Sequence, residues 1–438
     1  MCRKTPGDRI PAFFVLKNQT PGRQVDSGLD RESDLWNTLF ILSVKYESNG
    51  CLPAGPGLRE EFSLGKRIYM DNAATTRMDE EVFAAMRPFF MENFANPAAV
   101  CGPAQSAAAA VESARDRIAE MLGAEPSEIY FTSGGTEADN WAIRGMAEKA
   151  RKEGLGDHLI TSKIEHPAVL RTCQALERDG FEVTHLDVDE YGRVDPEQLE
   201  AAIRPDTFLI SIMAANNEIG TIEPATEIGR IAKKHGICFH TDAVQAFGHI
   251  PVDVNVLNAD LLSASGHKFH GPKGTGFLYM RRGTALPPLL YGGSQEHGRR
   301  AGTADVPGIV GMGKAAELAG EHMEEKMKKE IGLRDEMAER ILSEIPGARL
   351  DGAPAQTRSE MESGLSGAHL GGHHPFERLP GNLHFCFPGA PTETVLLLLD
   401  QAGICASGGS ACTSGSLEPS HVLRQSVSRT IPRAVRSG

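Results

Sequence analysis

The sequence predicts an α/β fold in which a seven-stranded, mostly parallel sheet carries helices on both faces. From about residue 67 onward, short apolar runs typical of buried strands alternate with longer amphipathic stretches of helical period. The chain has 438 residues, 40% of them hydrophobic and 24% charged, which is enough for two or three domains with a large core. The expected strands are residues 128–132, 158–162, 182–186, 207–213, 238–241, 261–265 and 276–279.

The pattern along the chain predicts a large domain at 67–325 and a smaller α/β domain at 326–438. Residues 1–66 mix Pro, Gly, Arg, Ser and Asp without periodicity, which is typical of an extension with little structure. Helices are expected at 79–90, 104–122 and 137–152, and a long helical pattern at 306–345 links the two domains. Residues 67–82 are expected to be able to pack with the small domain, which we predict to be incomplete at its C-terminus.

Residues 351–377 are rich in Gly, Ser, Ala and His and are expected to form a flexible insert. Their histidines are a weak metal signal, because no cysteine or carboxylate joins them at ligand spacing. A solvated loop is the favoured interpretation, and no metal site is predicted.

Composition excludes several classes of function. The net charge of −13 argues against general nucleic-acid binding, and no apolar run reaches the roughly 18 residues that span a membrane. Eight scattered cysteines without a Cys-x-x-Cys pair indicate neither a disulfide framework nor a zinc site. We therefore expect a cytoplasmic protein in a reducing compartment, with small molecules or proteins as partners.

A phosphate-binding turn is predicted at residues 132–137, Thr-Ser-Gly-Gly-Thr-Glu. This turn follows a strand and opens a helix, so backbone N–H groups near Gly135 and the Thr136 hydroxyl can hold an anion at the positive helix end. A plain strand-to-helix turn has the same appearance.

Asp242 and Lys268 each follow the end of a predicted strand, at the edge where parallel sheets bind ligands. Asp242 can pair with a protonated ring nitrogen, and Gln245 is expected on the same helical face. Lys268 is a candidate Schiff-base lysine, with Ser265 and His267 as phosphate donors. The alternatives are a helix N-cap for the aspartate and a surface lysine, a role that suits Lys273 better.

Three further positions complete the candidate set. His166 follows a strand and precedes a proline, so its ring can point into a cleft and act as an acid or base, although a lone histidine is usually structural. Amides at 216–220 again follow a strand and can bind a cofactor hydroxyl or a substrate carboxylate. Cys412 lies in a run of small residues typical of a mobile loop, and the alternative is a buried structural cysteine.

From about residue 69 to 423 the chain resembles the cysteine desulfurases, the NifS-like members of the class V aminotransferase family. The matching motifs are Tyr-Met-Asp-Asn-Ala-Ala-Thr-Thr at 69–76, the turn at 132–137, Glu-His-Pro at 165–167, residues 216–220, His-Thr-Asp-Ala-Val-Gln at 240–245, residues 265–268 and Ser-Ala-Cys-Thr-Ser-Gly at 410–415.

The resemblance implies a fold-type I homodimer that binds pyridoxal 5'-phosphate and removes sulfur from L-cysteine, giving L-alanine. Lys268 would hold the cofactor, and Cys412 would receive the sulfur as a persulfide for an iron–sulfur scaffold or another sulfur-acceptor protein. Cys412 could also bind an iron–sulfur cluster transiently. The implied cofactor residues are Gly135, Thr136, His166, Asn217, Asp242, Gln245, Ser265, His267, Lys268 and, from the other subunit, Thr303; Asn72 and Asn217 would contact the substrate.

The chain departs from the family pattern in three places. Residues 425–438 lack the arginine motif that clamps the substrate carboxylate, Cys101 stands where histidine is common, and His297 stands where arginine is usual. Three alternatives therefore stay open: a selenocysteine lyase, an inactive truncated paralogue that acts as a binding partner, and a simple class V aminotransferase.

Overall fold

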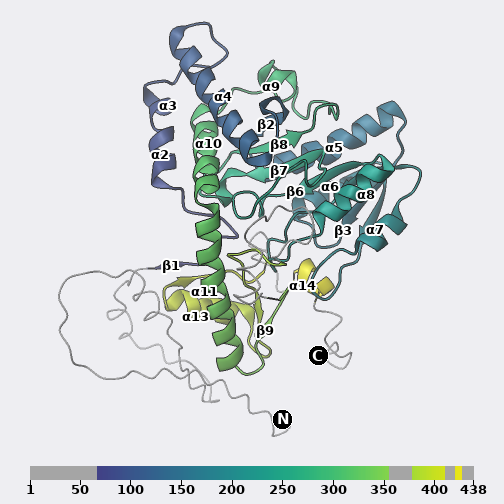
Figure 1. The fold of residues 1–438 in the computed structure, drawn as a ribbon, viewed down its shortest axis with the longest axis vertical. Coiled ribbons are helices and arrows are strands. Elements are labelled where there is room, and N and C mark those ends of the chain that lie inside the picture. Colours follow the sequence, from purple (N-terminus) through teal and green to yellow (C-terminus); the bar gives the residue numbers. More distant parts are fainter. Residues whose placement is uncertain (1–66, 355–376, 410–419, 427–438) are drawn as a thin grey trace, which may run out of the picture.

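A computed structural model describes residues 67–354, 377–409 and 420–426, and its centre is a seven-stranded sheet with the order β2-β8-β7-β6-β5-β3-β4 (Figure 1). The strands β3 to β7 pair in parallel, whereas β8 runs antiparallel to both of its neighbours. The predicted fold class is confirmed. The strands are β2 Ile129–Thr132, β3 His158–Ser162, β4 Glu182–Leu186, β5 Thr207–Ser211, β6 Cys238–Asp242, β7 Leu261–Ser265 and β8 Gly276–Met280.

Two hydrophobic cores enclose the sheet, one on each face. Neighbouring strand residues point to opposite faces, so Leu159 belongs to one core and Ile160 to the other. Helices α5 (Gly135–Glu153) and α6 (Pro167–Arg178) cover the first face. The second face is covered by α4 (Gly102–Leu122), α7 (Pro196–Ala202) and α8 (Ala225–His235). Burial on both faces explains why the strands read as continuous apolar runs.

Two of the predicted helices are each divided. The stretch expected at 79–90 forms α2 (Glu80–Met86) and α3 (Pro88–Met91), because Pro88 lacks an N–H group and starts a new helix. The stretch expected at 306–345 forms α10 (Val306–Glu321) and α11 (Met323–Glu344), with His322 at φ −111° and ψ 8° between them. This break lies where a buried apolar helix gives way to a charged one.

The C-terminal part of the described chain lies at the far end of α11 (Figure 1). Here β1 (Ile68–Tyr69) pairs in parallel with β11 (Ile404–Cys405), and β9 (Arg349–Leu350) pairs antiparallel with β10 (Phe385–Cys386). Helix α13 (Thr392–Gln401) precedes β11, and the short α14 (His421–Ser426) lies beside the main sheet. Residues near position 68 therefore pair with residues more than 330 positions later in the chain.

A buried arginine ties the C-terminal part to the turn at 216–220. The Arg378 guanidinium donates to the carbonyls of Ile219 (2.8 Å) and Ala353 (2.7 Å) and also to that of Asp351. Asp351 and Ala353 are themselves buried. The predicted insert therefore starts too early at residue 351, because its first residues belong to the packed structure, while residues 355–376 lie outside the described ranges.

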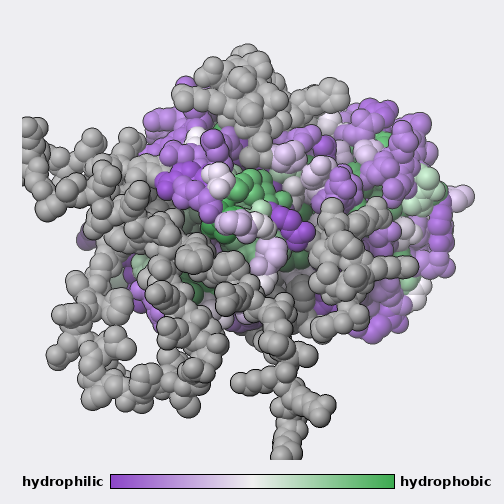
Figure 2. Space-filling view, turned by 90° about the horizontal axis from the view of Figure 1, so that it is seen from below, coloured by the Kyte–Doolittle hydropathy of each residue, from purple (hydrophilic) through white to green (hydrophobic). Residues whose placement is uncertain are grey.

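Seen from below, the described surface is mostly hydrophilic, with an apolar area near its middle (Figure 2). Among the described residues, no helix is long and apolar enough to cross a membrane.

Candidate active site

Three predicted site residues lie at the carboxyl edge of the sheet. Asp242 is the last residue of β6, and His166 follows β3 as the N-cap of α6. Lys268 ends a short 3-10 helix, η2 (Gly266–Lys268), that follows β7 directly. Ligands of open α/β sheets bind at this edge, because the loops that leave parallel strands diverge there.

A cavity of about 380 Å³ opens beside the first turn of α5. The first N–H groups of a helix have no partner within the helix and carry partial positive charge, so this turn suits an anion. Gly134 has a φ of +145°, and a Cβ on Gly135 would lie 2.6 Å from the Val244 side chain, so both positions require glycine. The cavity is lined by Thr75, Ser133, Gly134, Gly135, Thr136, Glu137, Ser265, His267, Lys273 and Gly274.

The side chain of Glu137 shapes the rim of this cavity. Its carboxylate accepts hydrogen bonds from the Ser133 N–H (2.9 Å) and from two nitrogens of Arg300 (2.8 and 2.9 Å). Burial works to raise the pKa of Glu137, but the hydrogen bonds from Arg300 and Ser133 outweigh it and lower the pKa. Arg300 therefore holds Glu137 as an anion. The N–H groups at the N-terminal end of α5 can bind a second anion in the cavity.

His267 contributes a neutral imidazole to the same cavity. Burial, together with the positive charges of Lys268 and Lys273, lowers the pKa of His267 to about 4. Its Nδ1 lies 3.1 Å from the Thr75 hydroxyl. A neutral donor beside two lysines suits a phosphate group, which accepts hydrogen bonds and carries the compensating charge.

The segment that contains Ala73 and Ala74 crosses the site and holds two predicted side chains. Lys268 Nζ donates to the carbonyls of Ala73 (2.5 Å) and Ala74 (3.0 Å). Gln245 Nε2 donates to the same Ala73 carbonyl at 3.0 Å. The predicted helical face for Gln245 is wrong, since residues 244–249 form turns, but the turn brings Gln245 to the site.

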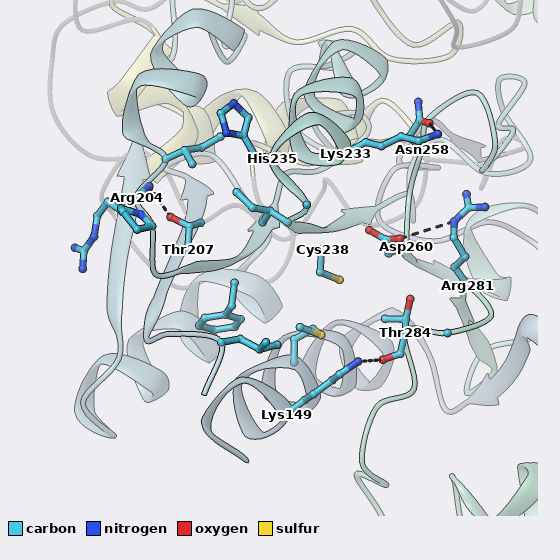
Figure 3. A pocket seen from close by; sticks show the side chains of 18 of the residues that line it. Lys149, Arg204, Thr207, Lys233, His235, Cys238, Asn258, Asp260, Arg281 and Thr284 are labelled. Carbon is cyan, nitrogen blue, oxygen red and sulfur yellow. Dashed lines mark hydrogen bonds and ion pairs between the residues drawn. The ribbon is translucent and has the colours of Figure 1, made fainter. Parts of the chain in front are cut away.

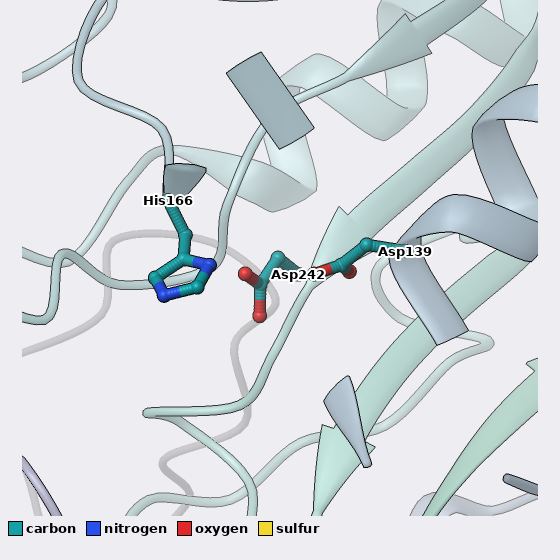
Figure 4. Close-up of side chains that lie close together, drawn as sticks. All are labelled: Asp139, His166 and Asp242. Atoms are coloured by element: carbon teal, nitrogen blue, oxygen red, sulfur yellow. The ribbon is translucent and has the colours of Figure 1, made fainter. Parts of the chain in front are cut away.

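The other end of the site holds a buried acid beside an imidazole. Asp242 is 5% exposed, and its carboxylate accepts a hydrogen bond from the Val244 N–H at 2.9 Å. His166 Nδ1 accepts from the Ala168 N–H at 3.1 Å, so the neutral ring carries its proton on Nε2. Burial lowers the pKa of His166 and raises that of Asp242. Figure 4 shows the His166 ring and the Asp242 carboxylate close together, with Asp139 behind them.

Two acidic residues at this edge carry no signal that distinguished them in the sequence. Asp139 belongs to α5 and is 1% exposed. Glu165 is fully buried, and one of its oxygens accepts hydrogen bonds from the Ser162 hydroxyl (2.7 Å) and the Met213 N–H (3.0 Å). Burial raises the pKa of Glu165 to about 8. Only the fold shows that these carboxyls are buried, because each occurs in an ordinary polar context in the sequence.

Asn216, the first residue of the turn at 216–220, stabilises the turn with its side chain. The Asn216 side chain donates to the Ile164 carbonyl (3.0 Å) and accepts from the N–H groups of Glu218 (2.9 Å) and Ile219 (3.1 Å). The hypothesis that the Asn216 amide binds a ligand is therefore wrong, because the turn uses it. Asn217 is only partly buried, and its predicted contact with cofactor or substrate stays a prediction.

Some predicted residues lie apart from this group. Asn72 and Thr303 are both exposed, and neither lines the cavity beside α5. Cys412 lies outside the described residues, as do residues 427–438 of the tail. Of the departures from the family pattern, Cys101 is the exposed N-cap of α4, and His297 is exposed with a φ of +57°.

A larger cleft of about 1060 Å³ lies at the opposite edge of the sheet, where β5 and β6 begin (Figure 3). Its charged side chains are held by surface groups, as in the contacts of Lys149 with the Thr284 carbonyl and of Lys233 with Asn258. Cys238 lies in its floor, and burial raises the pKa of this thiol well above its usual value, so it stays protonated. The cleft therefore offers room, but its Cys238 thiol is not activated.

Comparison with known proteins shows the family to which this chain belongs. The aminotransferase class-V family matches residues 68–434. A cysteine desulfurase IscS of Methanosarcina thermophila is 54% identical over 358 residues, which are 82% of this chain and 83% of the relative. A cysteine desulfurase IscS of Dictyoglomus turgidum is 49% identical over 82% of this chain and 85% of its own length.

Solved structures give the same result. A NifS-like protein superposes with a TM-score of 0.73 at 38% identity, covering 85% of this chain and 92% of its own. The protein SspA, in complex with cysteine, superposes with a TM-score of 0.67 at 39% identity, covering 82% of this chain and 94% of its own. The chain belongs to the aminotransferase class-V family, within its NifS-like cysteine desulfurase branch.

Proposed function

We propose that this protein is a cysteine desulfurase that binds pyridoxal 5'-phosphate at the carboxyl edge of the sheet and transfers sulfur from L-cysteine to Cys412. One observation carries the proposal: a buried carboxylate, a histidine and a lysine converge beside a cavity that suits an anion. The curated relatives named as cysteine desulfurases and the solved structure of SspA with cysteine support the same assignment.

The described residues fit the cofactor at both of its ends. At one end, the first turn of α5 with Ser265 and His267 would hold the phosphate, and a side chain at Gly135 would fill this cradle. At the other end, the buried Asp242 offers a negative charge for a protonated ring nitrogen. His166 would lie against the ring, and Gln245 is close enough to the site to reach the ring oxygen. When bound, the cofactor supplies an aldehyde that condenses with amines and a ring that accepts electrons.

Lys268 is the proposed attachment point and base. Its Nζ is held by two backbone carbonyls, which accept hydrogen bonds and impose no opposite charge. With the cofactor and substrate bound, the Lys268 Nζ would be placed to remove the α-proton of the substrate. His166 would then move a proton at its Nε2, because its Nδ1 is occupied by the Ala168 N–H.

Cys412 is the proposed sulfur acceptor. Its thiolate attacks the sulfur of the substrate, so that a sulfur–sulfur bond forms while the Cβ–Sγ bond of the substrate breaks. The electron pair of the broken bond stays on carbon, which takes up a proton and leaves as L-alanine. The persulfide on Cys412 then passes to an iron–sulfur scaffold or another acceptor protein.

Alanine release from L-cysteine, followed with Cys412→Ala as the matched variant, tests this proposal. We expect equimolar alanine and persulfide from the wild type, and loss of sulfide release at unchanged cofactor content in the variant. Sulfide release from C412A at the wild-type rate would contradict the persulfide step.

Each of the three alternatives predicts a separate outcome. A selenocysteine lyase would release selenide without needing Cys412, and a simple aminotransferase would require a keto acid. A chain that binds no cofactor and releases no alanine would be a binding partner rather than an enzyme.

The homodimer predicted from the family stays a proposal that Thr303 can test. Thr303 is exposed, so its hydroxyl can reach a second subunit. We expect Thr303→Ala to lower cofactor affinity in a dimer, as measured by sedimentation and cofactor dissociation. An unchanged cofactor affinity would show that Thr303 does not contact the cofactor.

A further inference from the structure

Asp139 lies in the second turn of α5, directly behind the proposed cofactor acid. It is 1% exposed. One of its carboxyl oxygens, one of Asp242 and one ring nitrogen of His166 all lie within 4.8 Å of one another. Figure 4 shows its side chain directed from the helix toward Asp242. The same helix carries the phosphate cradle at Gly135 in its first turn, so α5 contributes to both ends of the site.

Ionising both of two carboxyls that lie so close together in the protein interior requires a large free energy. Burial disfavours the ionised form of each, and the charge of one disfavours ionisation of the other. Burial and the neighbouring carboxylate raise the pKa of Asp139 well above its usual value, and burial also raises that of Asp242. The pair therefore holds one proton and one negative charge across neutral pH.

The surroundings of the two carboxyls decide which of them carries the proton. Asp139 faces neutral groups: the Ser263 hydroxyl, which works to lower its pKa, and His240, whose Nε2 lies 3.6 Å from an Asp139 carboxyl oxygen. Burial lowers the pKa of His240 to about 3, so this ring is uncharged. A Ser211 hydroxyl at 2.8 Å from His240 Nδ1 and the Ser263 hydroxyl at 3.0 Å from Nε2 complete a buried neutral chain across β5, β6 and β7.

Asp242 has surroundings that favour the charged form. Its carboxylate accepts the Val244 N–H, and the charges of His166 and Lys268 both work to lower its pKa. Glu165 also lies close to the pair: its charged form would raise the pKa of Asp139, and the charge of Asp242 helps to raise the pKa of Glu165. The negative charge is therefore more stable on Asp242 than on Asp139.

We propose that Asp139 is a positioning residue that holds the proton of the carboxyl pair and thereby leaves the negative charge on Asp242, where it faces the cofactor ring. This role rests on the proposed function, because the charge on Asp242 matters for a cofactor whose ring nitrogen is protonated. The proton itself belongs to the protein and is present with or without the cofactor.

Infrared spectroscopy of the full chain tests the proton directly. We compare Glu165→Gln with the double variant E165Q/D139N at neutral pH, because the E165Q background removes the carboxyl signal of Glu165. The difference should contain the carbonyl stretch of a protonated carboxylic acid, in the cofactor-free and the loaded protein alike. Loss of carboxylate bands instead would mean that Asp139 is charged, and would overturn the proposal.

A second readout uses the absorbance of bound cofactor during a pH titration. Asn is the neutral isostere of a protonated Asp, so Asp139→Asn should keep the titration midpoint within about half a pH unit. The matched Asp242→Asn should move that midpoint by more than about one unit. A shift that large in D139N would contradict the proposal. If the protein takes up no cofactor, the proposed function fails, while the infrared comparison still decides the state of Asp139.

Discussion

The two edges of the central sheet are both hollowed, and they differ in what their walls contain. The larger hollow, about 1060 Å³ at the edge where β5 and β6 begin, is bordered by charges held in exposed pairs such as those of Arg204 with Asp206 and Glu182. The smaller one, about 380 Å³ at the carboxyl edge, adjoins buried acids and the partly buried His166 and His267. Volume alone would therefore select the wrong edge.

The carboxyl edge is distinguished by three acids with raised pKa values that lie close together, although burial also raises the pKa values of Cys238 and Asp260 beside the larger cleft. Surface charges solvated by water and paired with flexible partners keep their ordinary states and contribute little. At the carboxyl edge, by contrast, burial raises the pKa values of Asp139, Glu165 and Asp242 and lowers that of His166. Groups with such shifts cluster where proton transfer is needed.

The largest expected effect is a difference in the rate of alanine release between replacing a lysine at the carboxyl edge and replacing one at the opposite edge. Lys268→Ala should reduce alanine release by more than about 10³-fold, because it removes both the attachment point and the base. Lys233→Ala in the larger cleft should leave the rate within about twofold, since this exposed amine bonds to Asn258 at the opposite edge of the sheet. The rate of alanine release from L-cysteine, measured under the same conditions, checks both variants. An equal loss of rate in the two variants would contradict the assignment of the reaction to the carboxyl edge.

A methyl group at the phosphate cradle should have the next largest effect. Gly135→Ala places a Cβ 2.6 Å from the Val244 side chain, so it should cost about 1–3 kcal/mol of stability and weaken cofactor binding. Gly320→Ala in α10 meets no atom within 4 Å and should stabilise the helix by up to about 1 kcal/mol. Thermal unfolding and cofactor titration measure the pair, and a G135A protein with wild-type affinity would remove the turn from the site.

The pH dependence of stability should differ between a buried and an exposed glutamate. Burial raises the pKa of Glu165 from 4.5 to about 8, so the native state binds an extra proton in this window. The free energy of unfolding should then fall as pH rises from about 4.5 to about 8, with a slope of at most about 1.4 kcal/mol per pH unit from this group. Glu165→Gln should remove that contribution, as measured by denaturant unfolding at several pH values.

Glu200 at the opposite edge is the matched control. Hydrogen bonds from Lys234 and His235 lower its pKa to about 2, so its contribution is present above its ordinary pKa of 4.5 and is lost only as pH falls toward 2. Glu200→Gln should therefore leave the profile between pH 5 and 8 unchanged. If both variants flatten that profile, burial is not its cause.

The smallest effect is expected from Arg204→Gln. This side chain pairs with Asp206 and Glu182 on the surface, and exposed ion pairs of this kind contribute little. We expect a slight fall in Tm and unchanged cofactor content and alanine release. A loss of activity in R204Q would show that the larger cleft communicates with the site.

The sequence predicts the sheet well, because buried parallel strands give continuous apolar runs bounded by turns. β3, β4 and β7 have the bounds that these runs indicate. Periodicity did not locate the break at His322, because the helical pattern continues on both sides of it and no proline marks it. The pairing of β1 with β11 joins two-residue strands, which are too short to give a pattern.

The position of a residue was predictable where a motif follows a strand, as with His166, Asp242 and Lys268, which lie together at the carboxyl edge, while their roles stay predictions. Asp139 was not predictable, because its importance comes from the tertiary contact between α5 and the sheet. Glu165 was quoted only as a neighbour of His166, and its burial is a property of the fold. Cys412 lies outside the described residues, so its role as sulfur acceptor still rests on its sequence motif.

The most direct test of the central claim is to locate the bound cofactor. Protein loaded with pyridoxal 5'-phosphate is reduced with borohydride, which fixes the cofactor covalently to its lysine, and is then digested and mapped by mass spectrometry. The structure predicts the added mass on Lys268, which follows β7 at the carboxyl edge and whose amine bonds to the carbonyls of Ala73 and Ala74. Added mass on Lys273, on a lysine of the opposite cleft, or on no lysine at all would contradict it.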